Sequence, residues 1–516
     1  MTRRDFLASL SSAAAPRRPN IVLIVADDLG FSDLGCYGGE IRTPNLDRMA
    51  AEGTRYSQFY NCAVCVATRA SLLTGLHPRF GGERLRPGMR TVAETLRNAG
   101  YRTAMSGKWH LGAQEPNRPV DRGFEEYYGV MSGSCNYFDP SIPSPFTKGR
   151  AGHGFVHNDR KVSSFPDGYY TTDAFSRHAA SEIRRQARSD RPFFLHLAYT
   201  APHFPLQARA EDIAKYRGRY RRGYEVLRRQ RYERMRRIGL IRDGWGLPAV
   251  DRRLGEFRYD YQVAAWRSEP DRDREQRLME IYAAMVDRMD FGIGLVMEAL
   301  RETGADSNTI VLFLSDNGGC ASLPLPEEMP AYHAYNRGRI LGGRDSYLFC
   351  GPGWATAQSA PFRRYKTWTY EGGITTPFIV RWPAKVPANV WRHEPAHVAD
   401  LLPTLAELGG ARYEGSPALE GRSLVSAFQG GSAGGTREFG WFLYGNRAYR
   451  EGPWKAVWGA TNFRWELFNM DEDRTETHDL ASREPERLAR LTRRWEEWAG
   501  TTGAPATGTP ADWNVY

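Results

Sequence analysis

Four apolar runs in this chain are each followed at once by a polar cluster. The first run, residues 20–26 (NIVLIVA), shows no alternation of apolar and polar positions and ends in Asp27-Asp28. Runs of this kind are typical of strands buried on both faces of a parallel sheet. The pattern therefore predicts an α/β fold. The other runs are residues 101–106, 192–199 and 308–315, which lead into GKWH (107–110), TAPH (200–203) and DNGG (316–319).

The polar clusters at the ends of these runs are expected to form one site. Ligands of open α/β sheets bind outside the carboxyl ends of the strands. Asp27 and Asp28 repel each other, and burying both is costly unless a cation lies between them. A helix cap is the alternative for that pair alone, but Asp316-Asn317 at an equivalent strand end favours a metal. A ligand set made of oxygen atoms suits Ca²⁺ or Mg²⁺.

The rest of the chain suggests helices between the strands and a smaller second unit. Helical apolar spacing occurs at 279–302 and at 398–408. After a Gly-rich and Ser-rich stretch, residues 438–458 alternate as antiparallel strands do, and 484–498 has a helical pattern. We expect the following division: a leader at 1–19, a catalytic domain at 20–415, a connector at 416–436, a C-terminal subdomain at 437–500 and a tail at 501–516.

The N-terminus has the features of an export signal. Residues 2–7 (TRRDFL) fit a twin-arginine motif, and an alanine stretch at 13–15 suits cleavage. We therefore expect a periplasmic or secreted bacterial protein; the alternative is a cytoplasmic protein with a basic, disordered leader. No apolar run reaches the roughly 18 residues of a membrane-spanning helix.

Residues 65–75 (CVATRASLLTG) place a sulfur near a predicted helix N-terminus. Backbone N–H groups and the helix dipole favour anionic character there, so Cys65 is a candidate nucleophile or modified residue. A buried free cysteine is the alternative. Cys62 and Cys65 also form a C-x-x-C, but no second Cys or His pair supports zinc and no thioredoxin-like context supports a redox site.

The same stretch resembles the signature of the type I sulfatases, C-x-[PA]-x-R-x-x-x-L-x-G. Further motifs between residues 20 and 481 are also similar to this family, and the arylsulfatase-like branch of the alkaline phosphatase superfamily fits best. The resemblance implies an alkaline-phosphatase-like fold, with a mixed, mostly parallel sheet flanked by helices. A small C-terminal α+β subdomain, made of an antiparallel sheet plus a helix, would follow. The signature positions are filled by Cys65, Ala67, Arg69, Leu73 and Gly75.

The resemblance also implies the chemistry of a sulfuric ester hydrolase. Cys65 would be oxidised to formylglycine by a formylglycine-generating enzyme, and one hydroxyl of its hydrate would attack sulfur. The metal would be Ca²⁺, with Mg²⁺ as the alternative. Its implied ligands are Asp27, Asp28, Asp316, Asn317 and the modified Cys65.

The remaining implied roles concern protons and sulfate oxygens. His110 matches the residue that takes a proton from the hydrate, and His203 the one that protonates the leaving alcohol. Lys108 and Lys366 would hold the sulfate oxygens, with Arg363 or Arg364 as alternatives to Lys366, and Arg69 would fix the hydrate. Asp121 and His157 are further candidates near the substrate.

The chain carries a net positive charge. The charge of +10 is concentrated in residues 215–237, which predict a solvated helical face or, alternatively, attraction of anionic substrates. No nucleic-acid motif accompanies it. The expected substrate is a small-molecule (aryl) or glycan (carbohydrate) sulfate ester. The rivals are a phosphonate monoester or phosphodiester hydrolase of the same superfamily, and a non-catalytic sulfated-glycan-binding protein with unmodified Cys65.

Overall fold

The structure is a computed structural model that describes residues 18–79, 85–146, 154–252, 262–459 and 463–505. The twin-arginine stretch lies outside the described residues, so export stays a prediction. Most of the tail expected at 501–516 lies outside them as well.

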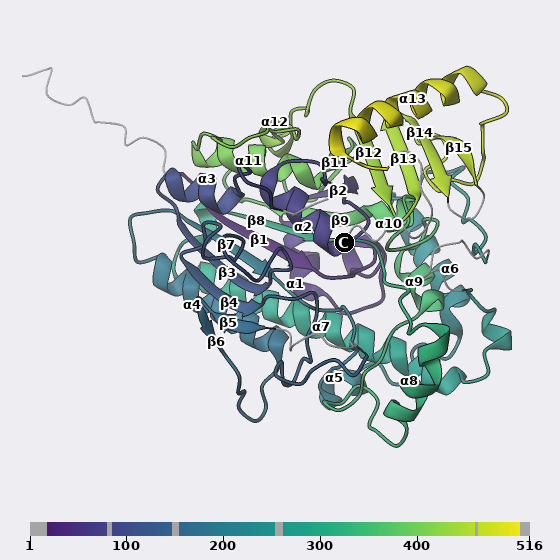
Figure 1. Cartoon of the computed structure of the whole chain (residues 1–516), viewed down its shortest axis with the longest axis horizontal. Coiled ribbons are helices and arrows are strands. Elements are labelled where there is room, and N and C mark those ends of the chain that lie inside the picture. The colour runs from purple at the N-terminus through teal and green to yellow at the C-terminus, as the bar shows by residue number, and fades with distance from the viewer. Residues whose placement is uncertain (1–17, 80–84, 147–153, 253–261, 460–462, 506–516) are drawn as a thin grey trace, which may run out of the picture.

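An 11-stranded mixed sheet forms the centre of the molecule (Figure 1). Its strands lie in the order β10-β2-β9-β8-β1-β7-β3-β4-β5-β6, and β11 also pairs with β2. Pairings in the middle of the sheet, between β8, β1, β7, β3 and β4, are parallel, whereas β9 runs antiparallel to both β8 and β2. The strands are β1 Asn20–Ala26, β2 Thr54–Tyr60, β3 Arg102–Lys108, β4 Glu126–Val130, β5 Phe155–His157, β6 Arg160–Lys161, β7 Phe193–Ala198, β8 Thr309–Ser315, β9 Thr375–Arg381, β10 Val390–Arg392 and β11 Ala396–His397.

Helices cover both faces of this sheet, which explains why β1 has no polar positions after Asn20. On one face lie α4 (Thr171–Gln186) and α7 (Arg272–Glu302); on the other lie α2 (Cys65–Thr74), α3 (Val92–Asn98) and α11 (Leu401–Gly409) (Figure 1). Successive residues of β1 point to opposite faces. Val22 and Ile24 pack in the cluster of α4 and α7. Ile21, Leu23 and Val25 pack in the cluster of α2 and α11. The predicted mostly parallel α/β fold is confirmed.

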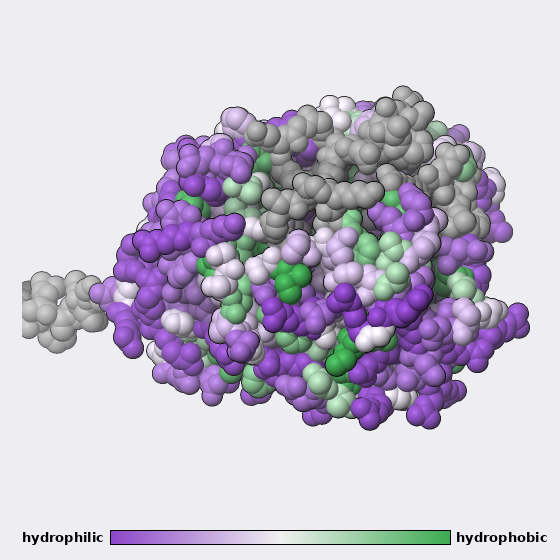
Figure 2. All heavy atoms as spheres, turned by 60° about the horizontal axis from the view of Figure 1, so that its bottom comes forward, coloured by the Kyte–Doolittle hydropathy of each residue, from purple (hydrophilic) through white to green (hydrophobic). Residues whose placement is uncertain are grey.

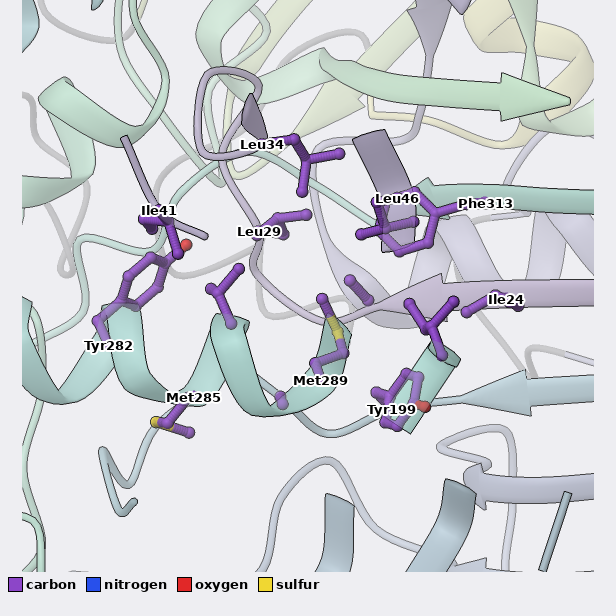
Figure 3. Close-up of a cluster of buried hydrophobic side chains, with 14 of the residues drawn as sticks. Ile24, Leu29, Leu34, Ile41, Leu46, Tyr199, Tyr282, Met285, Met289 and Phe313 are labelled. Atoms are coloured by element: carbon purple, nitrogen blue, oxygen red, sulfur yellow. The ribbon is translucent and has the colours of Figure 1, made fainter. Parts of the chain in front are cut away.

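The long helix α7 supplies much of one core. Figure 3 shows Tyr282, Met285 and Met289 of α7 in one buried cluster with Ile24 of β1 and Phe313 of β8. The helix begins at Arg272, seven residues before the predicted start at Met279, because the side chain of Asp271 caps it by accepting from the Arg274 N–H. The prediction missed this end because the first turn carries charged residues rather than apolar ones.

A capping group also reaches α1 (Pro44–Ala51) from α7. Asp290 accepts hydrogen bonds from the backbone N–H groups of Asn45 and Leu46, the first at 3.1 Å and the second at 2.8 Å. The residue before the helix, Thr43, makes no side-chain cap. A residue from another helix thus supplies the cap that Thr43 does not.

The basic run at 215–237 is solvated on one side only. It begins directly after α5 (Ala210–Ala214) and forms a turn and then α6 (Gly223–Arg237). Arg228 and Arg231 on α6 are buried, and Arg231 pairs with Asp33 and Glu40. The predicted solvated helical face is present, since Arg229, Glu233 and Arg236 are exposed, but the other side of α6 packs against the loop after β1. The remaining helices are α8 Met329–Asn336, α9 Pro352–Gln358, α10 Glu371–Ile374, α12 Val425–Phe428 and α13 Pro485–Thr502.

The C-terminal part forms a second sheet with one helix. Four antiparallel strands lie in sequence order, and α13 packs on them through Leu491 and Trp495. This confirms the predicted antiparallel sheet plus helix, while the domain boundaries around 416–436 stay a prediction. The strands are β12 Glu438–Leu443, β13 Asn446–Glu451, β14 Trp454–Gly459 and β15 Arg464–Asn469.

A buried ionic network joins the second sheet to the first. Lys455 of β14 donates to Glu371 of α10 and to Glu476 at 2.8 Å each, and all three side chains are fully buried. Arg474 also pairs with Glu371, and Arg450 bonds the Tyr60 hydroxyl of β2. Because an unpaired buried charge is costly, this network fixes the two sheets against each other.

The face of the molecule drawn in Figure 2 is mainly hydrophilic. Figure 2 shows one face of the molecule, where hydrophobic residues appear in small separate groups. Within the described residues, no helix combines the length and the hydropathy needed to cross a bilayer.

Candidate active site

The predicted site residues come together at the carboxyl ends of the central strands. Asp27 and Asp28 follow β1, Asp316 and Asn317 follow β8, and Lys108 ends β3. These five side chains are at most 1 % exposed. The strand order places β1 between β8 and β7, so segments far apart in the sequence meet at one edge of the sheet.

Cys65 occupies the first residue of α2, after extended Val64. Its Sγ lies 3.5 Å from Nδ1 of His110, and the side chain is buried. Burial raises the pKa of the Cys65 thiol, and Lys108 opposes that shift. The unmodified residue is therefore a thiol at neutral pH, which makes a simple thiolate nucleophile unfavourable.

Arg69 stands one turn after Cys65 on the same helix. It donates to Oδ2 of Asp316 from Nε at 2.9 Å and from Nη2 at 2.7 Å, and to the Lys108 carbonyl from Nη1 at 3.0 Å. Two charge-assisted hydrogen bonds to one carboxylate oxygen fix both groups. The spacing of the signature thus ties the start of α2 to the ends of β3 and β8.

Asp28 is the centre of a second set of contacts. Lys366 Nζ donates to its Oδ1 at 2.6 Å, and Asn317 Nδ2 donates to the same oxygen at 2.7 Å. His203 Nε2 lies 3.5 Å from the other oxygen, Oδ2. Lys108 makes the equivalent pair with Asp27, at 2.7 Å. The structure therefore brings Lys366 and His203 to the predicted site.

The arginines considered as alternatives to Lys366 lie elsewhere. Arg364 and Arg363 pair with Asp251, and Arg363 also pairs with Glu466. Lys366 is the cation of this segment that contacts the aspartate cluster.

Three buried oxygens in the cluster make no hydrogen bond: Oδ1 of Asp27, Oδ2 of Asp28 and Oδ1 of Asn317. Leaving a buried oxygen without a hydrogen bond costs free energy. A cation coordinated by all three oxygens would offset that cost. Ligand atoms of Asp27, Cys65 and Asp316 lie within 4.8 Å of one another, as do those of Asp27, Asp28 and His203. The oxygen set fits a hard divalent cation such as Ca²⁺.

The pKa values of the two adjacent aspartates are shifted in opposite directions. Burial raises the pKa of Asp27 to about 8, although Lys108 opposes the shift. Burial also acts on Asp28, but Lys366 and His203 outweigh it and hold its pKa well below the ordinary value. Burial lowers the pKa of His203 to about 3, so its imidazole is neutral in the unliganded site.

Two residues that hold the site were not found from the sequence. Tyr137 donates from its hydroxyl to the carbonyls of Thr200 and His203 and so fixes the turn that carries His203. Gly107 has φ +111°, and a Cβ there would lie 1.8 Å from the Ala198 carbonyl oxygen. The GKWH motif hints at the glycine, whereas nothing in the sequence singles out the tyrosine.

Two further candidates have their contacts elsewhere. Asp121 forms an ion pair with Arg118. His157 ends β5 at the far edge of the sheet, where it contacts Glu126. A role for either residue toward the substrate stays a prediction.

Comparison with known proteins identifies the family. The sulfatase family model matches residues 19–411. The chain belongs to the sulfatase family. Members of this family are sulfuric ester hydrolases, so this sulfatase is a hydrolase of sulfate esters.

Relatives and solved structures support the same assignment. This sulfatase is 36 % identical to an arylsulfatase of Klebsiella aerogenes, over 78 % of this chain and 89 % of that protein. It is 33 % identical to an uncharacterized sulfatase of Schizosaccharomyces pombe, over 96 % of each chain. The crystal structure of Ps i-CgsB in complex with k-i-k-neocarrahexaose has a TM-score of 0.70 at 28 % identity, covering 95 % of this chain and 94 % of that one.

Metal removal tests the assignment of the unsatisfied oxygens. A chelator is expected to lower the melting temperature, and Ca²⁺ to restore it, because a ligand that binds only the folded state stabilises it by about 2.7 kcal/mol at 100 times its Kd. Asp27→Asn removes one charged ligand and abolishes the Ca²⁺-dependent rise. The control is Asp243→Asn, whose side chain is 99 % exposed. Calorimetric melting that is insensitive to both chelator and Ca²⁺ would contradict the assignment.

Proposed function

We propose that this sulfatase cleaves aryl or carbohydrate sulfate esters with a formylglycine formed from Cys65 and with Ca²⁺ at the aspartate cluster. The observation that carries the proposal is the position of Cys65. Cys65 is the first residue of α2, and its sulfur lies beside His110. Ligand atoms of Asp27 and Asp316 lie within 4.8 Å of that sulfur. A nucleophile at this position faces both the oxygens that would hold the metal and the lysines that would hold the ester.

The metal site would be formed by the two strand ends. Asp27, Asp28, Asp316 and Asn317 would hold Ca²⁺, with Mg²⁺ as the alternative. When bound, the ion supplies Lewis-acid stabilisation of charge and lowers the pKa of a coordinated hydroxyl. The unsatisfied oxygens of the cluster support this assignment.

Lys108 and Lys366 flank Cys65 and would bind the sulfate oxygens. Both are buried, and each pairs with one aspartate of the cluster. Burial lowers the local dielectric, so a cation there stabilises developing negative charge more strongly than a solvated one. Arg69 would orient the nucleophilic group from the same helix, with its guanidinium held by Asp316.

Two histidines would move the protons. Nδ1 of His203 bonds the Phe204 carbonyl at 2.6 Å, which leaves Nε2 directed to the cluster. The negative charge of a bound ester favours the protonated imidazole, and Nε2 would then donate to the leaving alcohol. Nδ1 of His110 lies nearest to Cys65 and would accept a proton from the group formed there.

The relatives favour sulfated sugars or aryl sulfates as substrates. An arylsulfatase and a protein crystallised with a neocarrahexaose are both similar to this chain. The phosphonate monoester hydrolase of Agrobacterium radiobacter shares the fold at 18 % identity and a TM-score of 0.56, and phosphodiester hydrolysis is therefore the second activity to measure. Maturation would require a formylglycine-generating enzyme as a partner.

Replacing the proposed nucleophile tests the activity. Cys65→Ala is expected to reduce kcat/KM for aryl and sugar sulfates by about 10³-fold or more, because covalent catalysis is lost. Cys62→Ala is the matched control: it removes another buried thiol of the same C-x-x-C and retains activity. Equal loss in both variants would indicate a role of the thiol pair instead. Faster turnover of a phosphodiester than of any sulfate ester would favour the phosphonate-hydrolase alternative.

Comparing substrates whose leaving groups differ in acidity tests the role of His203 as the general acid. In His203→Ala, kcat for a sugar sulfate should fall by about 10²–10⁴-fold, the usual contribution of a general acid. Hydrolysis of 4-nitrophenyl sulfate should fall far less, because the acidic phenol leaves without a proton. His393→Ala, which removes an exposed histidine that contacts Ser57 of β2, is the control. The same loss on both esters would contradict the assignment of His203 as the acid.

A further inference from the structure

A second group of metal-ligating side chains lies at the far edge of the central sheet. Glu126 begins β4, His157 ends β5, and His178 lies on α4. One ligand atom from each of these residues lies within 4.8 Å of the other two. We propose that these three side chains bind a late first-row divalent cation, with Zn²⁺ as the preferred ion, separately from the catalytic site.

The chemistry of the three ligands fits Zn²⁺ rather than Ca²⁺. Two imidazole nitrogens and one carboxylate oxygen form a ligand set common in open zinc sites, where water completes the coordination. Glu126 Oε1 lies 2.6 Å from Nε2 of His157 and 3.5 Å from Nε2 of His178. Zn²⁺ bonds of 2.0–2.1 Å in a tetrahedron require ligand separations of about 3.3 Å. The contact between Glu126 and His178 is close to that value, and the contact between Glu126 and His157 would have to lengthen.

The surrounding residues orient these ligands as second-sphere groups do in metal sites. Ser106 of β3 hydrogen-bonds Nδ1 of His178, which leaves Nε2 of that ring directed at Glu126. The Tyr128 ring stacks on His178 with centroids 5.0 Å apart. Asn158 Nδ2 donates to the second oxygen of Glu126 at 3.4 Å. Such partners fix the tautomer and the ring plane, and their loss commonly weakens binding by 10–100-fold.

The charge state and exposure of the group also suit a cation. Burial opposes ionisation of Glu126, but hydrogen bonds from His178 and His157 outweigh it and lower its pKa to about 2, so the carboxylate is charged. His157 is 50 % exposed, while His178 and Glu126 are 16 % and 18 % exposed. Two ligands are thus largely buried, while His157 faces the solvent from which an ion would arrive.

The group is distinct from the catalytic cluster. Lys108 of that cluster is in register with Val130, and Glu126 lies four residues back along β4, about 13 Å at 3.3 Å per residue. The side chains of Ser106 and Tyr128 share the face of the sheet that α4 covers.

Hairpin β5-β6 is short, and two-stranded hairpins are marginally stable alone. The hairpin already pairs with β4 through β5, and a cation here would add a link to α4.

Calorimetric titration tests the proposal on the full-length protein saturated with Ca²⁺, so that the probe ZnCl₂ meets a filled catalytic site. The expected result is one Zn²⁺ bound per chain in the wild type. His157→Ala and Glu126→Gln should weaken binding at least tenfold, because the first removes a ligand and the second removes the charge of one. His157 is half exposed, so its replacement leaves the fold intact. The matched control, His333→Ala, removes an exposed histidine from α8 and should bind Zn²⁺ as the wild type does.

The catalytic-site variant Asp27→Asn separates the two metal sites. If Asp27→Asn retains the Zn²⁺ and His157→Ala loses it, the ion binds at Glu126, His157 and His178. This result does not depend on whether Cys65 is modified. Absence of Zn²⁺ binding by the wild type would overturn the proposal and leave a metal-free hydrogen-bonded triad. Binding that survives in His157→Ala but is lost in Asp27→Asn would also overturn it, because the ion would then lie in the catalytic cluster.

Discussion

The structure depends on the balance of buried charge at the carboxyl edge of the central sheet. Three carboxylates, from Asp27, Asp28 and Asp316, face three cations, from Arg69, Lys108 and Lys366. Leaving any one of these charges unpaired would cost several kcal/mol. Because the cations come from α2, β3 and the loop before α10, their pairs fix the segments that surround Cys65. The oxygens that remain unsatisfied are those that a metal would use.

The strand order brings residues that are far apart in the sequence close together in space. β1 lies between β7 and β8 in parallel register, so the residues that follow each of these strands leave the sheet side by side. Lys366 reaches Asp28 although 338 residues separate them in the sequence. The helices on both faces exclude water from the strands, which is why β1 reads as an unbroken apolar run. The same cover keeps the site residues in a medium where charge interactions are strong.

The sequence predicted those features that leave a local pattern. The apolar run at β1, the polar residues after it and the signature around Cys65 were all visible, and they locate the sheet and the cluster. Burial of Arg231, the cap that Asp290 gives to α1 and the meeting of His157 with His178 were not visible. Each depends on elements that approach only after the chain has folded, so no spacing along the sequence reveals them.

The most direct test of the central claim is the mass of the peptide that contains Cys65. The protein would be produced in a host with a formylglycine-generating enzyme, digested and analysed with hydrazide trapping, because the hydrated aldehyde has nearly the mass of the thiol. Conversion to formylglycine predicts a trapped aldehyde, about 18 Da lighter than the cysteine form when dehydrated. A Cys65 that remains a thiol and is fully alkylated, in protein that still hydrolyses sulfate esters, would contradict the proposed nucleophile.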